Sequence, residues 1–225
     1  MMFDLIETLL IKCYEKNISP LRYFSKEFIL SIISYAPDDV RLWLAKSMVH
    51  ATNINTAVCI LSKLIQDNEE LVRIEAADSL GVFISEDSFE ILSAATFDSS
   101  KLVRAYAYSG IAEIAVKCRS CDGITILHEA LDRETEPRVL LDVYAGLYLL
   151  GEKVYLWKIH QMFEESDYRT KCATLYTLED LATPENIKDI LSFLGSQSEK
   201  KLEVSVASTF KTVFNHLNNK FKGCL

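Results

Sequence analysis

The side chains best suited to catalysis or metal binding are scattered along this chain of 225 residues. Zinc peptidase sites place two histidines and a glutamate on one helical face, and neither His-Glu-x-x-His nor His-x-x-Glu-His spacing occurs here. We therefore expect each histidine to face solvent or the flank of a helix, with no catalytic role. The histidines are His50, His128, His160 and His216.

A Cys-x-x-Cys motif runs from Cys118 to Cys121. A structural zinc site of this type needs two more ligands, and no second pair of cysteines lies nearby. A thioredoxin-like site would need a βαβ context, which the surrounding helical pattern does not provide. We interpret the motif as the end of a helix and a loop that hold two thiols. We expect no metal, no cofactor and no enzymatic activity.

The charge balance points to a protein partner rather than to nucleic acid. The chain has 24 Lys and Arg against 32 Asp and Glu, a formal net charge of -8, whereas affinity for nucleic acid comes largely from basic side chains. An acidic surface attracts basic partners, although it also serves simply to keep proteins in solution. No apolar run reaches the roughly 18 residues of a membrane span, and residues 1–7 lack the basic start of a signal peptide. We expect a reduced, cytoplasmic protein with no membrane contact and no direct nucleic-acid binding.

The elements that must position any functional side chain are helices. Only seven Gly and four Pro are present, which favours long helices. Residues 1–17 form one amphipathic helix, and Ser19 and Pro20 begin a second as its N-cap and first residue. Pro37 ends that helix, so residues 1–36 are expected to cap the fold. The predicted buried stripe of the second helix is Phe24, Phe28, Ile29, Ile32 and Ile33.

From residue 40 onward, one apolar pattern repeats six times at intervals of 29 to 36 residues. Apolar or small residues follow the first position of each copy by four, five and eight residues. The first positions are Val40, Val72, Val103, Val139, Tyr168 and Leu202. Further helical stretches lie at 54–65, 87–97, 123–131, 152–163 and 184–194, the last with Thr183 as N-cap. A period in the low thirties is typical of stacked helical hairpins, so the chain is predicted to be all-α.

The clearest copy, residues 67–81, reads Asp-Asn-Glu-Glu-Leu-Val-Arg-Ile-Glu-Ala-Ala-Asp-Ser-Leu-Gly and recurs in part at 98–111. This pattern resembles the short HEAT-like repeat that is also found in phycobilin lyases. The resemblance covers about residues 37–217. It implies a right-handed α-solenoid of about six HEAT-like hairpins in a single domain, residues 1–225, with a tail at 218–225.

The resemblance also implies that an Asp and the Arg after it tie neighbouring hairpins together. The matching pairs are Asp67 with Arg73 and Asp98 with Arg104. In the fourth copy Glu134 occupies the acidic position, but Leu140 replaces the Arg. We therefore expect a looser joint or a bend at the fourth copy.

The repeated helices place a second set of side chains opposite their buried stripe, three, six and ten residues after the first position. By the resemblance, this row of helices lines a concave surface. The predicted partner-binding residues are Trp43, Lys46, Glu75, Asp78, Tyr106, Glu113 and Asp142. Aromatic residues among acids suit a basic protein partner. The alternative is that Trp43 and Tyr106 only pack against adjacent repeats, with the acids as an ordinary solvated face.

Two classes of function follow. The first is a non-catalytic protein-binding module that engages a basic protein through an acidic concave groove, either as an immunity-type inhibitor of a nuclease toxin or as a general scaffold or adaptor. The second is an enzyme on the same repeat scaffold, such as a bilin lyase or a DNA-base glycosylase. The glycosylase would need a cationic groove, and the lyase has only the resemblance behind it. The sequence favours the binding module.

Overall fold

The computed structural model describes residues 2–118, 122–198 and 202–223, and within them the chain is built from helices with no strand. The all-α prediction is confirmed. None of the described helices is long and apolar enough to cross a membrane. The chain divides into two compact units, Met1–Asp132 (unit 1) and Arg133–Leu225 (unit 2). The handedness of the solenoid, its number of repeats and its extent as a single domain stay predictions.

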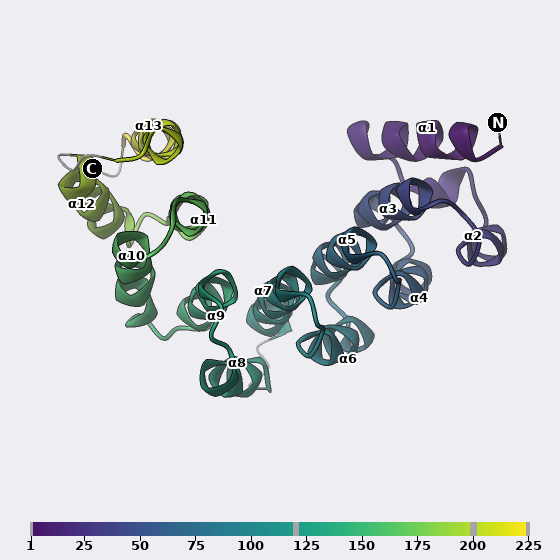
Figure 1. Cartoon of the computed structure of the whole chain (residues 1–225), viewed down its shortest axis with the longest axis horizontal. Helices are drawn as coiled ribbons and strands as arrows, with labels where there is room; N and C mark the ends of the chain where they lie inside the picture. Colours follow the sequence, from purple (N-terminus) through teal and green to yellow (C-terminus); the bar gives the residue numbers. More distant parts are fainter. Residues whose placement is uncertain (1, 119–121, 199–201, 224–225) are drawn as a thin grey trace. The chain divides into compact units, whose positions relative to one another are not determined.

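Unit 1 contains two rows of helices (Figure 1). One row is formed by the repeated helices α3, α5 and α7, with α1 packed against α3, and α4 and α6 belong to the other row. The elements are α1 (Met2–Glu15), η1 (Pro20–Arg22), α2 (Lys26–Ile32), α3 (Asp38–Ser47), η2 (Met48–His50), α4 (Ile54–Leu64), α5 (Glu70–Gly81), α6 (Glu86–Ala95), α7 (Lys101–Cys118) and α8 (Asp122–Arg133).

The predicted repeat pattern forms the core of unit 1. Val40, Val72 and Val103 are all buried, as are the small and aliphatic residues that follow each of them at the repeat spacing. Small residues let neighbouring helices approach closely. Helices α5 and α7 approach closely at two glycines, where a Cβ added to Gly81 would lie 2.9 Å from the Cα of Gly110. The two backbones therefore touch, with no room for a side chain between them.

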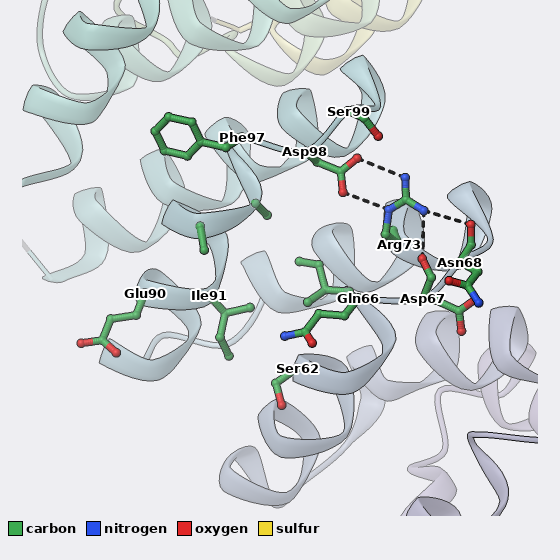
Figure 2. A pocket seen from close by; sticks show the side chains of 13 residues that line it. Ser62, Gln66, Asp67, Asn68, Arg73, Glu90, Ile91, Phe97, Asp98 and Ser99 are labelled. Atoms are coloured by element: carbon green, nitrogen blue, oxygen red, sulfur yellow. Dashed lines mark hydrogen bonds and ion pairs between the residues drawn. The ribbon is translucent and has the colours of Figure 1, made fainter.

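Bidentate ion pairs join successive hairpins of unit 1, but in a different pairing from the predicted one. Arg73 donates from Nε and Nη2 to the carboxylate of Asp98 at 2.9 and 3.1 Å. Arg41 binds Asp67 in the same way, at 2.6 and 3.0 Å. Each Asp thus pairs with the Arg of the preceding hairpin. The Arg that follows reaches its backbone instead, as Arg73 does at the carbonyl of Asp67, 2.9 Å away (Figure 2).

A local turn explains this pairing. Oδ1 of Asp67 accepts a hydrogen bond from the backbone N–H of Glu69 at 2.9 Å, and Oδ1 of Asp98 accepts one from Ser100 at 2.7 Å. Such turns are typical of Asp before a helix. They fix the carboxylate ahead of its own helix, where the Arg of the previous hairpin reaches it. The prediction from the resemblance was correct in residue types but wrong in partners.

The entrance to α2 also differs from the prediction. Ser19 and Pro20 begin only the short 3-10 turn η1, and the Ser19 side chain makes no capping bond. The N-cap of α2 is Ser25, whose side chain accepts from the backbone N–H of Phe28 at 3.2 Å. The helix is therefore shorter than predicted, and Phe28 is exposed rather than buried.

Unit 2 has a core of its own, formed by side chains from its five helices. Helix α9 packs against α10, α10 against α11, and α11 against α13. The elements are α9 (Pro137–Leu149), α10 (Tyr155–Glu165), α11 (Tyr168–Asp180), α12 (Ile187–Ser198) and α13 (Val204–Lys220). The boundary between the units falls just before the fourth copy of the repeat, whose Val139 is followed by Leu140 instead of Arg.

The predicted register of the fifth copy is wrong by two residues. Tyr168 and Tyr176 are exposed, and the buried residues of α11 are Thr170, Thr174, Leu175 and Leu178, which keep the same spacing. Asp167 is the N-cap of α11 and accepts from the backbone N–H of Thr170 at 2.8 Å. Because this cap starts the helix at Tyr168, the first inward position is Thr170.

Helix α12 begins at Ile187, three residues later than predicted. Buried Asn186 holds the preceding turn. Its Nδ2 donates to the carbonyl of Leu181 at 2.8 Å and to the Tyr148 hydroxyl at 2.7 Å. Its Oδ1 accepts from the backbone N–H of Thr183 at 2.7 Å. The carbonyl of Thr183 accepts from the backbone N–H of Ile187 at 3.0 Å, so Thr183 is tied to the first residue of the helix.

Candidate functional site

The most concentrated group of predicted site residues lies on α3 and α5 in unit 1. Trp43 and Lys46 are three residues apart on α3, so they share one side of that helix. The ammonium of Lys46 lies 3.3 Å from Oε1 of Glu75 on α5. It also lies 5.7 Å from the ring centroid of Trp43 and 5.2 Å from that of Tyr14 on α1. We call Tyr14, Trp43, Lys46 and Glu75 the Trp43 cluster.

Asp78 lies one turn beyond Glu75 on α5. Its side chain is exposed, and no described residue forms an ion pair with it. Burial by surrounding protein atoms raises the pKa of Asp78, and repulsion by Glu75 raises it further, while Lys46 lowers it. Two carboxylates thus share one neighbouring ammonium. Asp78 is the carboxylate that a further cation would stabilise.

The two predicted residues on α7 are in different environments. Tyr106 is half-buried and packs against the core of unit 1. Glu113 is exposed and forms an ion pair with Lys117 on the same helix, at 3.4 Å. Trp43 also packs partly against the core. The packing alternative therefore describes part of what both aromatic residues do, although each keeps some accessible surface.

Asp142, the remaining predicted residue, lies in unit 2 on α9. Its side chain is only 13% exposed and pairs with Arg138 one turn earlier. Burial raises the pKa of Asp142 to about 7, although the Arg138 guanidinium lowers it. Glu75, Glu113 and Asp142 thus each have a cationic partner within the chain. Side-chain pairing leaves this set of residues less acidic than its sequence suggests.

The repeat spacing pointed to His50, ten residues after Val40, but Tyr14 was not predicted. Tyr14 approaches Trp43 with a centroid distance of 6.0 Å, and its ring lies 5.7 Å from that of His50. Nε2 of His50 is buried and has no hydrogen-bond partner among the described residues. Tyr14 follows buried Leu10 by four residues on the inward side of α1. That spacing could have indicated it, but α1 lies outside the repeat.

The other histidines belong to α8, α10 and α13, and the cysteine motif begins at the end of α7. His128 and His216 are exposed. His160 stacks on Phe193 with a centroid distance of 3.9 Å, and burial lowers its pKa to about 4. Cys118 is exposed at the end of α7, and Cys121 lies outside the described residues. No group of three or more His, Cys, Asp or Glu in the described ranges could hold a metal ion.

A cavity of about 710 Å³ lies beside the ion pair of Arg73 and Asp98 in unit 1 (Figure 2). Aliphatic side chains, including Ile65 and Ile91, line part of it, and Glu90 on α6 lies at its edge. Arg73 donates to Asp98 and to two backbone carbonyls, so its donors are engaged within the chain. Both aliphatic and polar side chains therefore line the cavity, and its guanidinium is already engaged within the chain.

Comparison with models of known protein families gives no match, and comparison with curated protein sequences also gives none. Solved structures do give matches. One is the complex of CpcE and CpcF of phycocyanin lyase from Nostoc sp. PCC7120, with 13% identity, a TM-score of 0.44 and coverage of 86% of this chain and 95% of that chain. Another is an engineered protein, with 14% identity, a TM-score of 0.45 and coverage of 87% and 97%. Similarity at these levels identifies no activity.

Proposed function

We propose that this chain is a non-catalytic protein-binding module and that the side of α3, α5 and α7 carrying Trp43, Asp78 and Tyr106 engages a basic protein segment. The observation that carries the proposal is Asp78. Asp78 is exposed as a residue, its carboxylate is partly desolvated by surrounding protein atoms and repelled by Glu75, and it has no ion-pair partner among the described residues. A lysine or arginine of a partner that enters the group formed by Lys46, Glu75 and Asp78 would supply the missing charge. The partly exposed aromatic rings add contact area of the kind that anchors protein interfaces.

The overall charge supports the same proposal. With a formal net charge of -8, the chain attracts basic proteins over a distance, and this attraction weakens as salt rises. We place the site within unit 1 alone. Asp142 is left out because its carboxylate is already mostly buried and paired with Arg138.

A basic nuclease toxin is one partner of this chemistry, because nucleases bind phosphates with basic side chains. Inhibition of such a toxin in the cytoplasm is the specific form of the proposal, and a general scaffold or adaptor is its broader form. The specific form predicts that the purified chain blocks the nuclease activity of the partner at an equimolar ratio. The adaptor form predicts binding without loss of any activity of the partner.

The binding test uses the full chain as bait in an extract of its native host, followed by titration with the purified partner. We expect one basic protein to bind stoichiometrically and to be released by salt. Asp78→Asn should weaken its affinity about fivefold, the scale of a partly exposed ion pair. Asp87→Asn is the matched control, because Asp87 is an exposed Asp on α6, in the other helix row. Equal losses for both variants, or no loss for either, would remove the assignment of this face.

A further inference from the structure

We infer that Tyr14, Trp43 and Glu75 form a binding site for a cationic side chain, that Lys46 fills this site in the free chain, and that an arginine or lysine of the partner displaces it. This inference rests on the proposed function and adds the chemistry and the regulation of its site. Lys46 then acts as an internal competitor that lowers the affinity for the partner.

The geometry of the Trp43 cluster is that of a cation site. An ammonium within about 6 Å of an aromatic ring centroid is attracted by the negative face of the ring. The Lys46 ammonium meets this distance for two rings, at 5.2 Å and 5.7 Å, and contacts the Glu75 carboxylate at 3.3 Å. The side chains of Lys46 and Glu75 are 31% and 24% exposed, so water reaches the pair only in part.

The site does not depend on Lys46 for its shape. Tyr14 contacts the rings of Trp43 and His50, and Trp43 packs against the core of unit 1. The two rings and the carboxylate come from three different helices, α1, α3 and α5, which the hydrophobic core holds in place. Lysine, in contrast, is a point charge on a flexible stem of four carbons. It can leave the rings without unfolding any helix.

Asp78 is a second carboxylate with which the displaced Lys46 can form an ion pair. Lys46 already lowers the pKa of Asp78, whereas Glu75 raises it. When a second cation enters beside Glu75, Lys46 can turn to Asp78, and each carboxylate then faces one cation. This exchange balances the charge of the Trp43 cluster and Asp78, which together hold two carboxylates and one ammonium in the free chain.

The test removes the internal competitor. Lys46→Met keeps the length of the side chain but not its charge. We expect it to raise the affinity for a synthetic peptide of alternating glycine and arginine about fivefold, the scale of one partly desolvated cation–π contact. Trp43 is the reporter in a Trp157→Phe background, because the chain has two tryptophans and Trp157 is exposed on α10 of unit 2. The peptide is added stepwise, and the change in Trp43 fluorescence measures its binding.

The matched control is Lys117→Met. It removes the same charge from an exposed ion pair with Glu113 that involves no ring, so it reports the effect of net charge alone. A larger gain for Lys46→Met than for Lys117→Met supports the inference. Equal gains, or weaker binding by Lys46→Met, overturn it. If the natural partner still loses affinity with Asp78→Asn in that case, the proposed function stands and only the role of Lys46 falls.

Discussion

At the scale of single residues, the clearest predictions for stability concern side chains that make two hydrogen bonds to one partner. Arg73 makes two parallel bonds to Asp98 and a third to the carbonyl of Asp67. Only a planar guanidinium can satisfy all of these acceptors at once, because lysine is a point donor. The ion pair raises the pKa of Arg73, mainly through its hydrogen bond to Asp98. Both side chains are largely shielded from water.

Arg73→Lys should therefore lower the free energy of unfolding by roughly 2 kcal/mol, the value typical of losing charge-assisted hydrogen bonds. Urea denaturation followed by circular dichroism measures it. Arg169→Lys is the control, because Arg169 follows the predicted repeat position Tyr168 and its Nε donates to the hydroxyl of that exposed tyrosine on the same helix. Similar losses for the two variants would contradict a structural role for the ion pair of Arg73.

His160 predicts how the stability of the chain depends on pH. Burial lowers its pKa to about 4, partly offset by Asp189 and Glu164. The unfolded chain, where the pKa is about 6.5, takes up this proton first as the pH falls. The contribution of neutral His160 to stability is therefore fully present above about pH 6.5, and it is lost as the pH falls from about 6.5 to 4.

His160→Phe keeps an aromatic ring against Phe193 but cannot be protonated. We expect the difference in unfolding free energy between the natural chain and this variant to stay constant above pH 7. Below pH 6.5, the natural chain should lose stability relative to the variant. Urea denaturation at pH 7.5, 6 and 5 measures this difference. A difference that does not change with pH would show that His160 is protonated equally easily in both states.

At the scale of helices, replacing glycine by alanine should have opposite effects on stability at two positions: Gly110, where α7 approaches α5 closely, and Gly195, which has open space around it. A Cβ on Gly110 would lie 2.8 Å from Cδ1 of Leu92 and 3.0 Å from the Cα of Gly81. Gly110→Ala should cost about 1 to 3 kcal/mol through overpacking, despite the better helix propensity of alanine. Gly195→Ala, on α12, meets nothing within 4 Å and should stabilise by roughly 0.5 to 1 kcal/mol. Thermal unfolding of both variants checks the pair, and a loss at both sites would contradict it.

The helices themselves were largely predictable, because burial of a periodic stripe outweighs most local detail. The stripes that begin at Val40, Val72 and Val103 are buried as the sequence indicates. The prediction failed where a local cap set the start of the helix. With Asp167 as the N-cap of α11, the buried positions lie two residues later than the Tyr168-Arg169 pair suggested. Ser25, rather than Ser19, caps α2. Both caps depend on one side-chain hydrogen bond, which the apolar period does not encode.

At the scale of the whole molecule, the structure brings together some of the predicted site residues, while their role in binding stays a prediction. Lys46 lies six residues after Val40 and Glu75 lies three residues after Val72, and the packing of α3 against α5 brings the two side chains into an ion pair. The sequence alone does not show which acidic side chains form ion pairs inside the chain, because this depends on side-chain rotamers and on neighbouring helices. Tyr14 escaped because its contact with Trp43 comes from a helix outside the repeat.

The direction of the ion pairs in unit 1 has a consequence for synthesis of the chain. In both pairs the arginine precedes its aspartate, by 26 residues for Arg41 and 25 for Arg73. Chains emerge from the ribosome N-terminus first, and their early segments fold first. A newly made hairpin therefore presents an unmatched guanidinium until the following acid has been translated. Folding of these hairpins thus has a direction, because the hairpins of Arg41 and Arg73 each complete their ion pair only when the next aspartate is available.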